Sequence, residues 1–237
     1  MAGTRERARA ATTADILCIA REQMAALGAE GLSLRAIARE LGMVSSAVYR
    51  YVASRDELLT ALIIDSYDRL GAAAEVADRG VRRRADIRAR WRAVANAIRD
   101  WAMTNPSEYA LLFGTPVPGY AAPQDTIGPA TRYTLVLVQL LADLDATGVV
   151  RDTPVPKALR ADIARLRDVF GVPVHESTLV VGLSAWAALM GAINLELFGH
   201  LHNVVDRPGA LFEAVVAQHG ELLTGGTIGG RTASNPT

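Results

Sequence analysis

The sequence is poor in cysteine and has no excess of either charge. Cys18 is the single cysteine among 237 residues, so no disulfide can form within the chain. This is typical of a reducing compartment, and we expect a cytoplasmic protein. Cys18 lies in an apolar helical stretch, where a small buried side chain is expected rather than a reactive thiol. The 25 basic and 25 acidic residues cancel, which argues against nucleic-acid binding by bulk charge but allows a local basic surface.

Motifs of common enzymes and metal sites are also missing. The sequence has no phosphate-binding glycine loop, no HExxH motif, no cysteine nucleophile and no paired cysteines. His200 and His202 are the best metal candidates, but side chains two positions apart on a helix do not share a face. We therefore expect no catalytic residues, no cofactor and no metal, and an enzyme is kept as an alternative hypothesis.

One segment is apolar enough to suggest a membrane span. Residues 178–195 carry no charge over 18 positions, which meets the length criterion. The segment contains two glycines, a serine and Asn194, Glu196 follows shortly after it, and flanking arginines are absent. A helix that is apolar nearly all round also suits a position that packs in the core and in a dimer. We expect no membrane span here, and the N-terminal residues lack the apolar core of a signal peptide.

Helical periodicity runs through the whole chain, with no alternating strand pattern and no internal repeat. Thr12 or Thr13 predicts the start of a first helix, which Gly28 would end. Further helices are expected over residues 33–41, 45–52, 54–77, 83–104, 106–113, 129–147, 157–170, 176–201 and 207–223. A capping box at Ser54 marks the clearest of these starts.

Residues 33–52 hold two short helices joined by a tight turn. Their apolar positions can pack inward, and they are Leu34, Ile37, Ala38, Leu41, Val48 and Val52. A short, exposed second helix can enter a DNA major groove about 12 Å wide, while the first helix braces it. The pattern indicates a helix-turn-helix that binds DNA.

Four runs within residues 13–62 read LSLRAIA, LG, VYRYV and SRDELL. Their spacing, the Tyr-x-Tyr ending and the capped fourth helix resemble the DNA-binding domain of the tetracycline-repressor-like (TetR) regulators. The resemblance implies an all-α protein with an N-terminal three-helix helix-turn-helix domain over residues 1–60, which begins with a disordered arm over about residues 1–11. A C-terminal helical ligand-binding and dimerisation domain over residues 61–223 and a disordered tail from residue 224 to 237 would follow.

The resemblance also implies which side chains contact DNA. They are Ser33, Arg35, Ser45, Ser46, Ala47, Tyr49, Tyr51 and Arg55. Arg35 could pair bidentately with guanine, and Ala47 suits a thymine methyl group. Arginines 5, 7 and 9 of the arm would add minor-groove or backbone contacts. Three positions depart from the family pattern: Val44 replaces the polar cap of the recognition helix, Val52 replaces a phenylalanine, and Arg55 replaces a lysine.

Two runs in the C-terminal half, residues 105–114 and 186–191, are similar to a TetR subgroup named for a Trp-His-Gly motif. Met190 stands at the histidine position, which puts that histidine's role in doubt here. The resemblance implies a domain that binds a small molecule and forms a homodimer through its last two helices. Large side chains on successive helices could line the cavity. They are Tyr67, Trp91, Trp101, Tyr109, Phe113, Tyr133, Trp186 and Met190.

These expectations converge on a repressor. A homodimer would bind palindromic double-stranded operator DNA, because two half-sites need recognition helices about 34–36 Å apart or a multiple of that. A largely apolar effector would fill the cavity, shift the fourth helix and release the operator. The alternative is a small-molecule-binding helical protein of the same fold that does not bind DNA, which Val44 alone favours.

Overall fold

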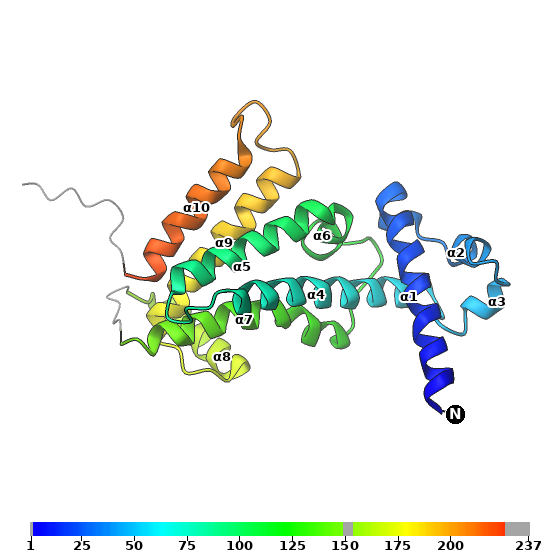
Figure 1. Cartoon of the computed structure of the whole chain (residues 1–237), viewed down its shortest axis with the longest axis horizontal. Helices are drawn as coiled ribbons and strands as arrows, with labels where there is room; N and C mark the ends of the chain where they lie inside the picture. The colour runs from blue at the N-terminus through cyan, green and yellow to red at the C-terminus, as the bar shows by residue number, and fades with distance from the viewer. Residues whose placement is uncertain (1, 149–153, 226–237) are drawn as a thin grey trace, which may run out of the picture. The chain divides into compact units, whose positions relative to one another are not determined.

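The computed structural model describes residues 2–148 and 154–225, and no strand occurs among them. The elements are α1 (Ala2–Leu27), η1 (Ala29–Gly31), α2 (Leu34–Glu40), α3 (Ser45–Val48), α4 (Arg55–Gly80), α5 (Ile87–Thr104), α6 (Pro106–Phe113), η2 (Gln124–Thr126), α7 (Ile127–Asp145), η3 (Lys157–Leu159), α8 (Arg160–Phe170), α9 (Glu176–Leu197) and α10 (Pro208–Leu223) (Figure 1). The prediction of an all-α fold is confirmed.

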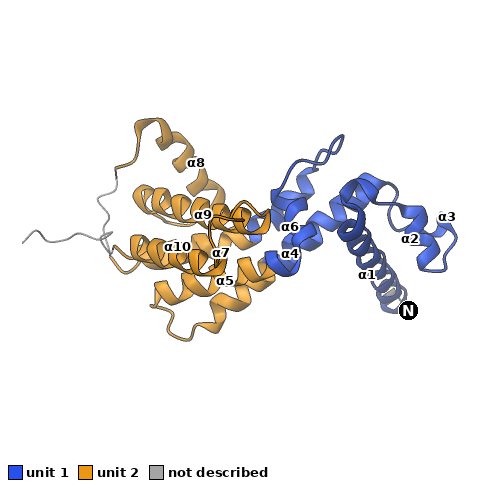
Figure 2. Cartoon of the chain, turned by 90° about the horizontal axis from the view of Figure 1, so that it is seen from above, with its two compact units in different colours: residues 1–70, 102–132 blue, residues 71–101, 133–237 orange. Residues whose placement is uncertain are grey.

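The chain divides into two compact units, coloured separately in Figure 2. Unit 1 contains residues 1–70 and 102–132, and unit 2 contains residues 71–101 and 133–237. This differs from the expected division at residue 60, because α4 continues without a break to Gly80 and residues 102–132 return to unit 1. Most of the tail that was expected to be disordered, residues 226–237, lies outside the described residues.

Helix α1 begins about ten residues earlier than the sequence predicted. The hydroxyls of Thr12 and Thr13 donate to the carbonyl oxygens of Ala8 and Arg9, each at 3.0 Å, so they lie within the helix and do not cap it. Alanine and arginine, both strong helix formers, dominate residues 2–11 and extend the helix. The prediction of a disordered arm over these residues is therefore wrong for Ala2 onward.

Cys18 is exposed on α1, so the prediction of a buried cysteine is wrong. The buried residues of this helix are Ile16, Ala20 and Met24, which follow one another at intervals of four positions. Cys18 lies two positions from Ile16 and therefore points away from that face.

The helices of the N-terminal region share one apolar core. It consists of Ile16, Ala20, Met24, Leu32, Leu34, Ile37, Ala38, Val48, Val52, Leu58, Leu59 and Leu62, and we call it the helix-turn-helix core. Two serine hydroxyls cap the N-termini of two of the helices that contribute to this core. The Ser33 hydroxyl accepts the Ala36 N–H at 3.3 Å, and the Ser54 hydroxyl accepts the Glu57 N–H at 3.1 Å. Both predicted helix starts are confirmed.

Unit 2 is held together by an apolar core and by a buried arginine. The apolar face of α5 is buried, from Trp91 to Trp101. Arg90 on the same helix is 1% exposed, and its guanidinium donates to Asp78 and to Asp143, each at 2.7 Å. Because Asp78 belongs to α4 and Asp143 to α7, this one side chain joins three helices.

Helix α9 packs beside α10 in unit 2 (Figure 1). Within the described residues it is the one helix that is long and apolar enough, by length and composition only, to cross a membrane. Of its most apolar 18-residue stretch, 39% is buried. Leu189 and Ile193 are fully buried, whereas Leu183 and Leu195, which share a stripe of positions four residues apart, are 40% and 44% exposed. One face of α9 therefore packs inside the unit, and a second apolar face is uncovered in the single chain.

Candidate nucleic-acid interface and cavity

Five of the residues expected to contact DNA are at least partly accessible, four of them as candidates for base contacts and Tyr49 for a phosphate contact. Arg35 lies in the first turn of α2 and is exposed, and Ser45 and Ser46 are exposed at the start of α3. Ala47 is half-buried, and Tyr49, directly after α3, is 44% exposed. The buried side chains of both helices belong to the helix-turn-helix core, so the polar face is left free for a groove.

Helix α3 is shorter than predicted, because it ends at Val48 and residues 49–51 form a turn. Val44 occupies its N-cap position with extended dihedrals, φ −69° and ψ 141°, and supplies no side-chain hydrogen bond. Its side chain is 71% exposed. The first turn of the recognition helix is thus held by Val48 in the core, without a side-chain cap.

Tyr51 and Arg9 contact each other at the end of this turn. The Arg9 guanidinium lies 5.3 Å from the centre of the Tyr51 ring, and its Nη2 donates to the Arg50 carbonyl at 3.3 Å. Arg9, expected in a disordered arm, instead joins α1 to the segment after α3. Tyr51 is half-buried, so its ring serves this contact as well as any contact with phosphate.

Ser33 and Arg55 have structural partners of their own. The Ser33 N–H donates to the Gln23 side chain at 3.1 Å, a support that no sequence signal indicated. Arg55 donates through Nη2 to the Ala29 carbonyl at 3.0 Å and so attaches α4 to η1. A guanidinium has five N–H donors, and the others remain available for a phosphate oxygen.

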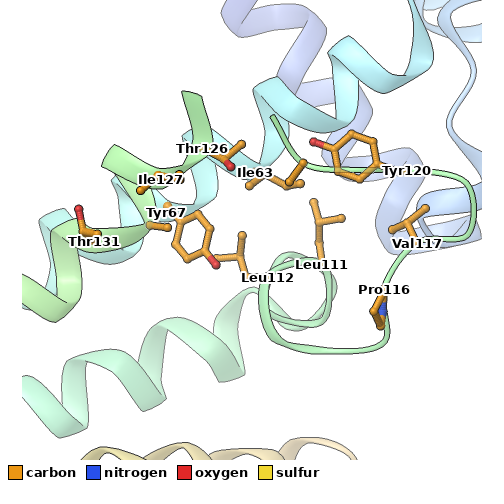
Figure 3. A pocket seen from close by; sticks show the side chains of 12 residues that line it. Ile63, Tyr67, Leu111, Leu112, Pro116, Val117, Tyr120, Thr126, Ile127 and Thr131 are labelled. Atoms are coloured by element: carbon orange, nitrogen blue, oxygen red, sulfur yellow. The ribbon is translucent and has the colours of Figure 1, made fainter. Parts of the chain in front are cut away.

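A cavity of about 400 Å³ lies within unit 1 (Figure 3). Its walls come from α4, α6, the segment after α6, η2 and α7, and they are Ile63, Tyr67, Leu111, Leu112, Pro116, Val117, Tyr120, Ala122, Thr126, Ile127, Ala130 and Thr131. Of the eight residues expected to bind a ligand, all of them described, Tyr67 alone lines this cavity.

The other seven lie elsewhere, mostly in the cores of the two units. Trp91, Trp101, Tyr109, Tyr133 and Met190 are buried, Phe113 is half-buried, and Trp186 is 37% exposed. Trp91 donates its indole N–H to the Val216 carbonyl at 2.8 Å and borders a void of about 20 Å³, room for one water molecule. Trp186 donates to the Tyr133 hydroxyl at 3.3 Å. The prediction used side-chain size and helical spacing, and these criteria chose mostly residues that fill the core.

The segment between α6 and α7 supplies the wall that the sequence analysis missed. Tyr120, among the prolines of this segment, was the one available signal. Its hydroxyl lies 2.8 Å from the Thr60 hydroxyl, which itself donates to the Asp56 carbonyl, so Tyr120 is the donor. Tyr120, Val117 and Leu111 also pack against the helix-turn-helix core. The cavity and the DNA-binding elements therefore share side chains.

His200 and His202 are exposed in the turn after α9. No group of three or more His, Cys, Asp or Glu residues that could hold a metal ion occurs in the described parts of the chain.

Two family models match the chain. The model described as bacterial regulatory proteins, tetR family, matches residues 16–62, and the tetracyclin repressor-like C-terminal domain matches residues 91–219. Among curated proteins, the HTH-type transcriptional regulator Rv1816 of Mycobacterium tuberculosis is 44% identical over 232 residues, which cover 92% of this chain and 97% of the relative. The regulator Mb1846 of Mycobacterium bovis matches to the same extent.

Solved structures agree with these relatives. The putative regulatory protein SCO4313 has a TM-score of 0.74 and 35% identity, with 90% of this chain and 97% of that chain covered. A protein of unknown function from Rhodococcus sp. RHA1 has a TM-score of 0.65 and 25% identity, with 90% and 94% covered. The Trp-His-Gly subgroup stays a prediction. With both of its regions matched, the chain belongs to the TetR family of helix-turn-helix transcriptional regulators.

Proposed function

We propose that the protein is a homodimeric repressor that binds palindromic operator DNA and releases it when a small, largely apolar ligand fills the cavity of unit 1. The observation that carries the DNA part is the exposure of Arg35, Ser45 and Tyr49 on consecutive elements above one apolar core. Such a regulator works in the cytoplasm and needs no catalytic residue.

Placement of charge, rather than its amount, supports this proposal. Residues 1–60 contain eight arginines and seven acidic residues, a net charge of only +1. Bulk attraction to phosphate is therefore weak, and affinity depends on where individual arginines lie. Arg35 is exposed at the start of α2, where its forked donors can reach a guanine edge.

The contacts of Tyr120 support release by a ligand. The side chain lines the cavity, donates to Thr60 of α4 and packs against the helix-turn-helix core. A ligand that displaces Tyr120 changes the packing of the helix-turn-helix core, to which α2 and α3 contribute. The operator-bound and ligand-bound arrangements then differ in contacts that the ligand itself makes, as a population shift requires.

The uncovered face of α9 supports a dimer through α9 and α10. Leu183 and Leu195 expose large apolar side chains on one stripe of a helix that carries few charges. A second copy of the chain would bury them, and the dimer would present two recognition helices to two half-sites.

Selection from random duplex DNA tests the DNA part. The purified protein is incubated with a random pool at about 150 mM salt, and the retained duplexes are sequenced. We expect an enriched palindrome. An Arg35→Ala/Tyr49→Ala variant should bind it at least tenfold more weakly, since one bidentate arginine–guanine pair contributes about 1–3 kcal/mol. Arg160→Ala, which removes an exposed arginine of α8, is the matched control and should bind like the unmodified protein.

Two outcomes would contradict this proposal. If the folded double variant and the Arg160→Ala control bind the operator with equal affinity, α2 and α3 are excluded as the elements that recognise the operator. No enriched sequence over a salt series, from folded protein freed of ligand, would favour the member of the fold that does not bind DNA.

A further inference from the structure

We infer that the cavity of unit 1 binds an uncharged, largely apolar molecule that carries a hydrogen-bond acceptor, and that the Tyr67 hydroxyl donates to this acceptor. The inference rests on the proposed effector role of the same cavity and adds the chemical class of the ligand. Ketones, esters and ethers carry such an acceptor without a charge.

The lining of the cavity excludes a charged ligand. None of its twelve described residues is ionised at neutral pH, and eight of them are alanine, leucine, isoleucine, valine or proline. A carboxylate or an ammonium group placed there would lose its water without gaining an opposite charge, which is strongly unfavourable. The volume of about 400 Å³ lies in the range of ordinary small-molecule sites.

Four hydroxyls line the cavity, and three of them are already used. Tyr120 donates to Thr60 at 2.8 Å, Thr126 to the Pro123 carbonyl at 2.7 Å, and Thr131 to the Gly128 carbonyl at 2.7 Å. The fourth belongs to Tyr67, whose hydroxyl makes no hydrogen bond to another described residue. Tyr67 is half-buried, and a cavity-lining hydroxyl without a protein partner favours a ligand that supplies one.

The surroundings of Tyr67 keep it in place as a donor. Its ring meets Phe113 edge to face, with centroids 5.9 Å apart and an interplanar angle of 87°. Phe113 is held in turn by Tyr109, 4.9 Å away. Burial raises the pKa of the Tyr67 hydroxyl above its ordinary value of 10.0, so the group stays protonated at neutral pH. In Figure 3, Tyr67 and Tyr120 lie toward opposite ends of the cavity wall.

Three naphthalene probes of nearly the same shape test the inference. They are 2-acetylnaphthalene, which has a neutral acceptor, 2-ethylnaphthalene, which has none, and 2-naphthoate, which is charged. Affinities are measured by equilibrium dialysis against the full chain at neutral pH. We expect the ketone to bind most tightly and the carboxylate most weakly. Tyr67→Phe should weaken ketone binding roughly three- to tenfold, the worth of one neutral hydrogen bond, and leave 2-ethylnaphthalene unchanged.

Two further variants locate the binding. Ala130→Leu narrows the cavity and should weaken both neutral probes. Val169→Ala shortens an exposed side chain of α8, outside the cavity and the proposed dimer face, and should affect neither. Tyr67→Phe keeps the ring that packs on Phe113, and thermal melting checks that each variant is folded.

Several results would overturn the inference. They are tighter binding of 2-naphthoate than of the ketone, a Tyr67→Phe effect equal for ketone and hydrocarbon, or no binding of either neutral probe. Operator binding is measured on the same samples. Operator binding without probe binding rejects this inference alone, whereas probe binding without operator binding rejects the proposed function.

Discussion

Arg90 shows how a single buried residue can organise a unit of this protein. Its guanidinium donates to Asp78, to Asp143 and to the Arg84 carbonyl, and it is 1% exposed. Burial by itself would raise the pKa of Asp78, but the hydrogen bonds and charges of Arg90 and Arg84 outweigh it and hold that pKa below its ordinary value of 3.8. The ionised form of Asp78 therefore stabilises the folded state.

We expect Arg90→Met to lower the free energy of unfolding at pH 7 by about 3 kcal/mol, because it leaves a partly buried carboxylate without its main partner. Urea unfolding measures this. Asp78 contributes stability above the unfolded pKa near 3.8 and loses it as the pH falls through the lower folded pKa, so the difference from the unmodified protein should shrink below about pH 4. Arg92→Met breaks an exposed pair with Glu213 and should cost less than about 1 kcal/mol. Equal losses for the two variants would refute this account.

At the scale of elements, α3 is the least supported part of the DNA-binding region. It has four residues, follows a turn in which Gly42 adopts φ +63°, and begins at Val44 without a side-chain cap. The unmet N–H groups of its first turn are left to water or to DNA. The Val44 side chain is 71% exposed, so it contributes little packing in exchange.

We expect Val44→Ser to stabilise the protein by about 1 kcal/mol, because a serine hydroxyl can accept an N–H of the first turn. The melting temperature should rise by about 2–4 °C for a chain of this length. Val44→Ala removes the same exposed side chain without adding a cap, and it should not raise the melting temperature. If alanine stabilises as much as serine, the missing cap is not the reason.

For the whole molecule, the proposed dimer depends on the uncovered apolar face of α9. Leu183 is 40% exposed on this face, and the helix contains Glu176 and Glu196 as its charged residues. Exposure of such an apolar face to water is unfavourable, so association with the same face of a second copy is favoured.

We expect Leu183→Arg to convert the proposed dimer into a monomer at micromolar concentration. Each copy would place an arginine in the interface, where the two positive charges lose water and repel each other. Sedimentation equilibrium measures the mass, and operator binding should weaken with it. Val76→Arg places the same charge at an exposed apolar position of α4, 62% exposed, and should leave the dimer intact. A Leu183→Arg variant that remains dimeric would exclude this face as the interface.

Most of the sequence-based predictions that are confirmed depend on interactions between residues close together in the chain. The starts of α2 and α4 depend on Ser33 and Ser54, which bond to N–H groups three positions further along the chain. The buried faces of α4 and α5 follow the helical repeat. Where local signals competed, the prediction was wrong: Thr12 and Thr13 look like caps, but the helix formers before them continue α1.

The sequence by itself thus determined the helices, the helix-turn-helix and the family, because periodicity, caps and motif spacing act over a few residues. Tertiary structure alone decided that residues 102–132 return to unit 1 and that Tyr120 reaches Thr60, sixty positions away in the chain. It also decided that Tyr67 faces a cavity while Trp91 fills a core. Large apolar side chains are equally suited to both places, and only contacts between distant segments distinguish them.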